Sequence, residues 1–545
     1  MSGASKEHAT EILIVGGGLG GVSAALATTR LGRKVMLVEE LDWLGGQLTA
    51  QAVPLDEHPW AESLVSSQSF AALRGGIRAW YRDHKPLTDA ARRDLLLNPG
   101  MGNIGTLCCE PVVAVRVIEA MLAPAVAAGS LAILREHRVT GCKVDGDRIS
   151  GVDVLDLKTG TNLSISASIV IDATETGELL ALARVERVLG AESQTETGEL
   201  HAIEGPADPL DQQALTWGFA LDYLPGEDHR IDKPEGYEHF RTLKLPFWPG
   251  PQFGWAVSNH VTHQPLDRKL FIGDTDEPYL FDLWHARRIA ARRNFLPGAY
   301  ASDITIANWP QMDYWLKPVV GVSEEAARAA LDEARRFSLS FFYWLQTEAP
   351  RHDGGNGYPG LRLRGDVLGT ADGLAKQAYY REGYRIRAEF TVLEQHIGVE
   401  ARAGFDRAEY FHDSVGIGAY RIDLHPATRG TRDTVDIDTF PFEIPLGALL
   451  PVRSDNLLPA CKNIGTTRIT NGAYRVHPVE WSIGEASGAL AAYALAHNIP
   501  LRAVRSDAKR LEDFQAVLDG LGVLRHWPFY GALKPGSRRG YRPPS

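Results

Sequence analysis

Cysteine is scarce in this chain, with four residues in 545. They are Cys108, Cys109, Cys142 and Cys461, and no two of them have CxxC spacing. The scarcity argues against a disulfide framework, and the spacing argues against an iron–sulfur cluster or a structural zinc site. We therefore predict no metal site. We expect the adjacent Cys108 and Cys109 to pack in the interior rather than to form a redox couple.

Long apolar runs and an excess of positive charge are also missing. The most apolar stretch, 112–134, contains Arg116 and Glu119, so it falls short of the roughly 20 apolar residues of a membrane helix. The net charge of -11 gives no electrostatic footprint for nucleic acid. The first residues lead into a strand pattern without a separate signal region. We expect a cytoplasmic protein that binds neither membranes nor nucleic acids.

The length of 545 residues is too great for one simple core, so we expect two closely connected domains. The first of them begins with a glycine-rich turn between two apolar strand patterns. Residues 11–16 (EILIVG) predict a buried parallel strand, a helical pattern follows the glycines, and 34–39 (KVMLVE) predict a second strand. This is the order of a βαβ unit that binds a dinucleotide.

The glycines of this turn fit the spacing GxGxxG. The first permits a tight turn, the second lets a diphosphate approach the backbone, and the third lets the helix pack on the strand. A carboxylate at the end of the second strand is placed to bind ribose hydroxyls. The same cradle serves FAD and NAD(P), so this segment alone leaves both open. The predicted cofactor residues here are Gly16, Gly18, Leu19, Gly20, Gly21, Glu39 and Glu40.

Two later segments add candidates for cofactor binding. The loop 44–49 carries Gly46 and Gln47 directly after the second strand, and its glycines suit a close ligand approach. A strand over 163–172 ends in Asp172, Ala173 and Thr174, which would bring small and polar side chains to the phosphates. For both segments an ordinary loop or strand-to-helix turn is the competing interpretation.

The middle and the end of the chain differ in character. Residues 184–363 are rich in Pro, Trp, His and charge, with a helix predicted over 323–348 whose segment 341–345 belongs to a core. The basic run 285–293 predicts a helix with a solvated face. Near the C-terminus, 456–463 predict a strand and 479–496 a helix rich in small residues. The N-terminus of such a helix would stabilise negative charge on a reduced flavin.

A series of longer motifs makes the sequence similar to the broad family of bacterial FAD-dependent oxidoreductases. They include GGGLGG, WLGGQLTAQAVPLDEHPW, IDATETGELLALA, HDSVGIGAYRIDLHP and RVHPVEWSIGEASGALAAY, in this order. The resemblance implies FAD as the cofactor. It also implies an α/β fold with a Rossmann-type, glutathione-reductase-like FAD-binding domain and an inserted mixed α+β substrate domain. One departure is Ala460-Cys461-Lys462, where the family commonly has Ala-Gly-Arg; we expect Cys461 to pack as a small residue.

From this we predict four segments. Residues 1–183 form the first part of the FAD-binding domain, and 184–375 form the substrate domain. Residues 376–500 complete both domains, and 501–545 are a C-terminal extension.

The predicted reaction is oxidation of a small hydroxylated, sugar-like substrate by hydride transfer to flavin N5, with oxygen or another acceptor as the electron partner. A histidine is suited to remove the substrate proton. The candidates are His412, His425 and His477, with His58 and His352 behind them, although each one alone is more often structural. Tyr420, Arg421, Tyr474 and Arg475 are the predicted substrate-binding residues, with arginine suited to carboxylates.

Three other functions remain open at this point. One is a flavin monooxygenase or desaturase on the same scaffold, which for the oxygenase requires an external reductant. Another is a non-catalytic flavin-binding protein. The third is an NAD-dependent dehydrogenase, which would be colourless when purified.

Overall fold

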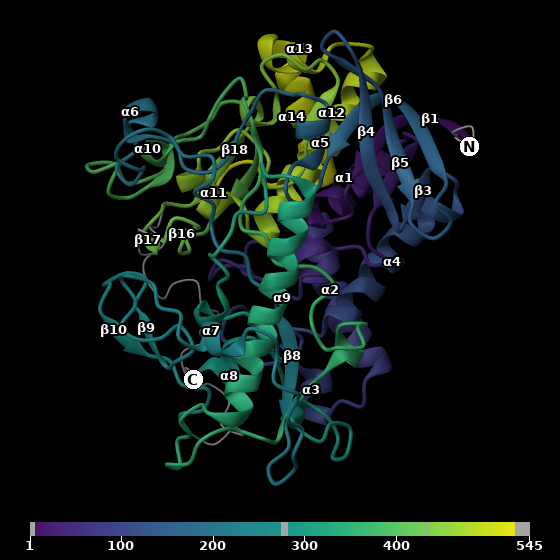
Figure 1. Ribbon diagram of the computed structural model, residues 1–545. Helices are drawn as coiled ribbons and strands as arrows, with labels where there is room; N and C mark the ends of the chain where they lie inside the picture. Colours follow the sequence, from purple (N-terminus) through teal and green to yellow (C-terminus); the bar gives the residue numbers. More distant parts are fainter. Residues whose placement is uncertain (1–5, 274–281, 431–433, 529–545) are drawn as a thin grey trace.

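A computed structural model of the protein describes residues 6–273, 282–430 and 434–528. Its main sheet is formed mostly by the N-terminal part of the chain (Figure 1). The strand order is β3-β2-β1-β6-β5-β4, and β19 also pairs with β6. The pairs β3–β2, β2–β1, β1–β6 and β6–β19 are parallel. The pairs β6–β5 and β5–β4 are antiparallel. The strands are β1 (Lys6–Val15), β2 (Val35–Glu39), β3 (Leu131–Arg135), β4 (His137–Asp145), β5 (Arg148–Asp156), β6 (Asn162–Asp172) and β19 (Leu457–Pro459).

The predicted βαβ unit is present as β1, α1 (Leu19–Arg30) and β2. Ten of the twelve residues of α1 are buried, because small side chains such as Ala24 and Ala25 let neighbours approach on several sides. Together with the parallel sheet this confirms a Rossmann-type α/β fold. The glutathione-reductase-like subtype and the inserted domain stay predictions, as do the segment boundaries at 183, 375 and 500.

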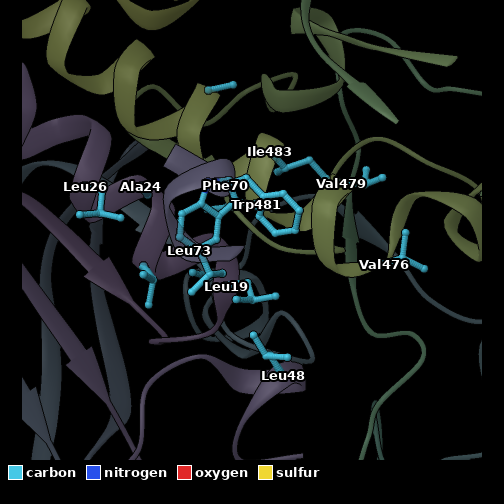
Figure 2. Close-up of a cluster of buried hydrophobic side chains, with 14 of the residues drawn as sticks. Leu19, Ala24, Leu26, Leu48, Phe70, Leu73, Val476, Val479, Trp481 and Ile483 are labelled. Carbon is cyan, nitrogen blue, oxygen red and sulfur yellow. The ribbon is translucent and has the colours of Figure 1, made fainter. Parts of the chain in front are cut away.

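Helix α12 (His477–His497) joins the end of the chain to its beginning by packing against α1. A Cβ on Gly484 would collide with the carbonyl of Gly20, and one on Gly488 with the carbonyl of Ala24. Thr28 Oγ1 also lies 3.3 Å from the carbonyl oxygen of Gly488. Figure 2 shows the apolar side chains around this contact, with the ring of Phe70 beside that of Trp481 in α12.

A second sheet, in the order β11-β12-β8-β13, supports a separate core in the middle of the chain. The long helix α9 (Glu324–Thr347) packs there, with Ser323 accepting a bond from the amide of Ala326 at its N-cap (Figure 1). Phe341, Phe342 and Leu345 are fully buried, which confirms the core assignment of 341–345. The strands are β8 (Phe219–Tyr223), β11 (Arg288–Ala290), β12 (Ile304–Ala307) and β13 (Leu361–Leu363).

The predicted basic helix over 285–293 is wrong. Helix α8 (Leu283–Ala286) ends there, and the chain continues as strand β11. The reason is tertiary: Arg288 is 1% exposed and pairs with Asp303 at 2.7 Å, so a residue that reads as solvated charge is part of the interior.

The C-terminal helix starts two residues earlier than predicted, at His477, because Pro478 fits the first turn.

The other elements are shorter or lie at the periphery. The helices are α2 (Gln68–His84), α3 (Asp89–Arg93), α4 (Pro111–Ala127), α5 (Glu178–Leu182), α6 (Gln194–Thr197), α7 (Tyr237–Arg241), α10 (Glu394–Ile397), α11 (Arg468–Tyr474), α13 (Leu501–Ser506) and α14 (Ala508–Leu521). The strands are β7 (Arg187–Val188), β9 (Ala256–Ser258), β10 (Pro265–Asp267), β14 (Arg385–Ile386), β15 (Ser414–Gly418), β16 (Ile422–Leu424), β17 (Val435–Ile437) and β18 (Phe442–Pro445). Among the described residues, none of these helices is both long and apolar enough to cross a membrane.

Candidate active site

A pocket of about 750 Å³ lies at the carboxyl ends of β1, β2 and β6. Ligands of open α/β sheets bind at this edge. We call this space the cradle pocket. Its lining includes seven of the predicted cofactor residues: Gly16, Gly18, Glu39, Glu40, Gly46, Ala173 and Thr174.

The glycines of the turn are required by its geometry. Gly16 has a φ of +100°, and a Cβ there would collide with the carbonyl of Ala173. A Cβ on Gly18 would lie 3.0 Å from Glu175 Oε1, inside the pocket wall. Gly20 and Gly21 face the opposite way, toward the carbonyls of Ala460 and Gly16, so they permit close packing of α1.

Glu39 ends β2 with its carboxylate held in a fixed place. Its Oε2 accepts a hydrogen bond from the amide of Gly17 at 2.5 Å, and its Oε1 accepts one from Leu41 at 2.8 Å. Burial raises the Glu39 pKa to about 7. The neighbouring Glu40 is exposed at the rim of the same pocket, 3.9 Å from Arg138. A fixed carboxylate at this strand end is suited to bind ribose hydroxyls.

The end of β6 divides its predicted residues between two tasks. Ala173 and Thr174 line the cradle pocket. Asp172 is fully buried and does not line it; its Oδ1 accepts bonds from the amide of Thr174 at 3.0 Å and from its hydroxyl at 2.7 Å. Burial raises the Asp172 pKa to about 7. Asp172 therefore shapes the turn that presents the other two residues.

Behind the glycines lies a buried group of side chains that includes the predicted Gln47, together with Glu175, Lys462 and Glu480, which the sequence did not predict. Glu480 Oε1 accepts from the amide of Gly20 at 3.0 Å, and Gln47 Nε2 donates to Glu480 Oε2. Burial raises the Glu480 pKa to about 7, with Glu175 adding to the shift. Lys462 Nζ lies 2.6 Å from Glu175 Oε2. The signal for this group is weak in the sequence, because its members come from three distant segments.

A second polar group lies beyond Gln47 and is centred on an Asp–His pair. His425 Nδ1 donates to Asp313 Oδ2 at 2.7 Å, and Asp313 Oδ1 also accepts from Thr216 at 3.0 Å and pairs with Arg381 at 3.1 Å. Burial alone would raise the Asp313 pKa, but His425 and Arg381 bring it below its usual value. Burial lowers the pKa of His425, with Arg381 adding to the shift and Asp313 opposing it. This leaves a neutral imidazole whose Nε2 is the basic nitrogen.

Arg475 connects this pair to the buried group behind the glycines through Gln47. Gln47 Nε2 donates to the backbone oxygen of Arg475 at 3.1 Å. The Arg475 guanidinium donates to the hydroxyl of Tyr379 at 2.5 Å and to the carbonyl of Asp423 at 3.0 Å. Asp423 Oδ2 in turn lies 3.9 Å from His425 Nε2. We call Asp313, Tyr379, Arg381, Asp423, His425 and Arg475 the arginine–aspartate cluster.

Comparison with known proteins identifies the family. A model of the FAD dependent oxidoreductase family matches residues 11–518. The chain belongs to this family. A search of curated proteins gave no match. This FAD-dependent oxidoreductase therefore binds FAD, and the glycine turn, the fixed Glu39 carboxylate and the small residues of the cradle pocket fit that cofactor.

Similarity to solved structures is distant. Sdh1 of Mycobacterium smegmatis in complex with UQ1 is 13% identical, with 93% of this chain and 72% of that chain covered and a TM-score of 0.34. The glycerol-3-phosphate dehydrogenase of Bacillus halodurans complexed with FAD is 15% identical over 41% and 40% of the two chains, with a TM-score of 0.22. L-proline dehydrogenase from P. horikoshii is 16% identical over 34% of this chain, which spans a quarter of that chain's length, with a TM-score of 0.19.

The other predicted histidines of the oxidoreductase have different surroundings. His477 is fully buried, its Nδ1 accepts from the amide of Asp56 at 3.1 Å, and its Nε2 donates to the carbonyl of Val53 at 3.0 Å. Both ring nitrogens are therefore engaged with backbone, which argues against the predicted role as a base. His412 and His352 are exposed and do not line the cradle pocket. His58 is buried against Trp60 and Trp527.

All four predicted substrate residues are buried and have partners within the protein, which for Arg475 are Tyr379 and Asp423. Arg421 pairs with Asp436 at 2.6 Å and also with Asp438. The Tyr474 hydroxyl donates to the carbonyl of Glu443 at 2.7 Å. Tyr420 is buried, with its carbonyl accepting from Thr439 at 2.7 Å. Of the four we carry only Arg475 into the proposed function.

The cysteines of the oxidoreductase are free thiols. Cys108, Cys109 and Cys461 are buried, and burial raises the pKa of Cys108 to about 12. Burial also raises the pKa of Cys461 well above its usual value, and its amide donates to Asn463. These observations agree with the expectation that Cys461 packs as a small interior residue.

His477 gives the folded state a specific dependence on pH. Burial lowers its pKa to about 4, so the folded protein favours the neutral ring. The unfolded chain takes up a proton near pH 6.5, and the folded chain does so only near pH 4. This contribution is complete above pH 6.5, and about 3 kcal/mol is lost as the pH falls through that window.

We expect the free energy of unfolding in urea to fall between about pH 7 and about pH 5, and to fall less in His477→Gln. The glutamine retains one donor and one acceptor but no titrating ring. Equal pH dependence in the two proteins would show that His477 does not titrate in this way.

Proposed function

We propose that this FAD-dependent oxidoreductase oxidises a small hydroxylated, sugar-like organic substrate, with His425 as the base that removes the hydroxyl proton. The observation that carries the proposal is the 2.7 Å hydrogen bond between His425 Nδ1 and Asp313. An ionised carboxylate on Nδ1 fixes the ring orientation and leaves Nε2 to accept a proton. Bound FAD supplies the hydride acceptor, with oxygen or another acceptor as the final electron partner.

The surroundings of His425 support this role in two ways. The ring is mostly buried, with 13% of the side chain exposed, so the proton transfer takes place away from bulk water. Arg475 and Tyr379 then provide donors for substrate oxygens. Arg475 is 3% exposed, and its Nε has no hydrogen-bond partner among the described residues. Buried donors of this kind normally find an acceptor, and a substrate oxygen is one.

The test is anaerobic reduction of the purified flavoprotein by a panel of sugars, polyols, hydroxy acids and amines. We expect a hydroxylated compound to bleach the visible absorbance of oxidised flavin without added NAD(P)H, because the substrate itself delivers the hydride. Bleaching only by NAD(P)H would favour a monooxygenase instead. A folded, FAD-loaded protein that no compound reduces would favour a non-catalytic flavin protein.

A further inference from the structure

A buried ion pair between Lys462 and Glu175 lies at the edge of the cradle pocket, which Glu175 lines. Lys462 Nζ is 2.6 Å from Glu175 Oε2, 3.1 Å from the carbonyl of the same residue and 3.4 Å from Cys461 Sγ. The Lys462 side chain is 1% exposed and that of Glu175 is 10% exposed. Burial alone would lower the pKa of Lys462, but Cys461, Glu175 and Glu480 together raise it, so the amine is charged.

The second oxygen of Glu175 occupies the place that the glycines leave open. Glu175 Oε1 is buried and has no hydrogen-bond partner within the described ranges. A Cβ on Gly18 would lie 3.0 Å from this oxygen, and a Cβ on Gly46 would collide with it. Both glycines and Glu175 line the cradle pocket. An unpaired carboxylate oxygen in a buried site is unfavourable. The ion pair between Lys462 and Glu175 Oε2 therefore keeps Oε1 in this position.

Carboxylates surround the glycine turn, where the diphosphate of the cofactor is expected to bind. The amide of Gly20, in the first turn of α1, already donates to the carboxylate of Glu480. Glu175 and Glu480 thus place two carboxyl groups beside Gly18, with oxygens at 3.0 and 3.1 Å from its Cβ position. A diphosphate brings more negative charge to the N-terminus of α1. Lys462 is a cation that contacts Glu175 and acts electrostatically on Glu480.

We propose that Lys462 binds the diphosphate of FAD and that Glu175 competes for the same amine, so cofactor binding exchanges one ion pair for the other. In this exchange the Glu175 carboxylate leaves the space over Gly18 and Gly46. No covalent bond changes. The proposal concerns cofactor affinity alone, and it does not depend on the substrate or on the role of His425.

The test is the affinity of the apoprotein for FAD, measured by quenching of flavin fluorescence during titration. Glu175→Gln removes the competing charge and is expected to lower the Kd by about tenfold. Lys462→Met removes the cation and is expected to raise the Kd by about tenfold or more. Glu325→Gln is the matched control, because Glu325 is exposed in the first turn of α9 and does not line the cradle pocket, and its Kd is expected to equal that of the wild type.

Folding is controlled with the double variant Glu175→Gln/Lys462→Met, which leaves no unpaired charge from this pair. We expect it to melt like the wild type and to bind FAD more weakly than Glu175→Gln alone. Riboflavin, which lacks the diphosphate, is expected to bind Glu175→Gln and the double variant equally. A higher Kd for FAD in Glu175→Gln, an unchanged Kd after loss of the Lys462 charge, or an equal loss for riboflavin would overturn the proposal.

Discussion

Replacing His425 with Asn is expected to slow substrate-driven flavin reduction by about 10²- to 10⁴-fold, the range for loss of a positioned general base. The substrate hydroxyl would lose its proton acceptor, while Asp313 keeps Arg381 and Thr216 as partners. FAD content should be unchanged because His425 does not line the cradle pocket. The measurement is the rate of anaerobic flavin bleaching in a stopped-flow instrument, at saturating substrate.

His239→Gln is the matched control, because His239 is an exposed residue of α7 in the middle of the chain. Its bleaching rate is expected to equal that of the wild type. If His425→Asn reduced flavin at the wild-type rate, another residue would have to be the base. A loss of bound FAD in His425→Asn would instead indicate a structural role.

The positioning of His425 by Asp313 has its own signature in the pH profile. A base works in its neutral form, so the rate falls on acidification through its pKa, which burial places below the usual histidine value. Asp313 raises the His425 pKa, so Asp313→Asn should move this acid limb to lower pH as well as reduce the rate. A lower rate without any movement of the limb would assign Asp313 to folding alone.

Gly484→Val is expected to be the most damaging substitution outside the active site. The added side chain would collide with the carbonyl of Gly20 and force α12 away from α1. We expect the free energy of unfolding to drop by about 3 kcal/mol, at the upper end for overpacked interiors. FAD binding should weaken in parallel, because the amide of Gly20 and Glu480 belong to the same two helices. Chemical denaturation and FAD titration would measure the two effects.

Gly75→Ala provides a control of opposite sign. Gly75 lies in α2, and a Cβ there would meet nothing within 4 Å. The exchange removes backbone freedom from the unfolded chain and should stabilise the protein by about 0.5 to 1 kcal/mol. Equal effects of the two substitutions would mean that the close approach of α1 and α12 does not limit stability.

The features that the sequence predicted well are those whose signal is local. The β1–α1–β2 unit depends on a continuous strand, a glycine turn and a small-residue helix, all within about 30 residues of chain. The burial of Phe341, Phe342 and Leu345 also follows from their own apolarity. The small residues of 479–496 also predict a helix, and α12 begins two residues before that range, at His477.

The features that the sequence did not reveal depend on contacts between distant segments. Asp313 and His425 are 112 positions apart, and nothing near either residue indicates the other. The same is true of Glu175 and Lys462, 287 positions apart. His477 had the right residue type for a base, but its two backbone partners at Val53 and Asp56 are visible only in the fold. Local patterns therefore predict elements, whereas the choice among candidate side chains needs tertiary structure.

The packing of α12 on α1 also has a consequence for synthesis on the ribosome. Once Arg30 has been added, roughly 450 more residues must follow before α12 begins to emerge, which takes roughly 20 to 90 s at ordinary rates of translation. Throughout that time the side of α1 that α12 will cover faces solvent in the nascent chain. β19, which completes the parallel sheet beside β6, is made equally late. The domain made first in the chain is therefore among the last to reach its final structure.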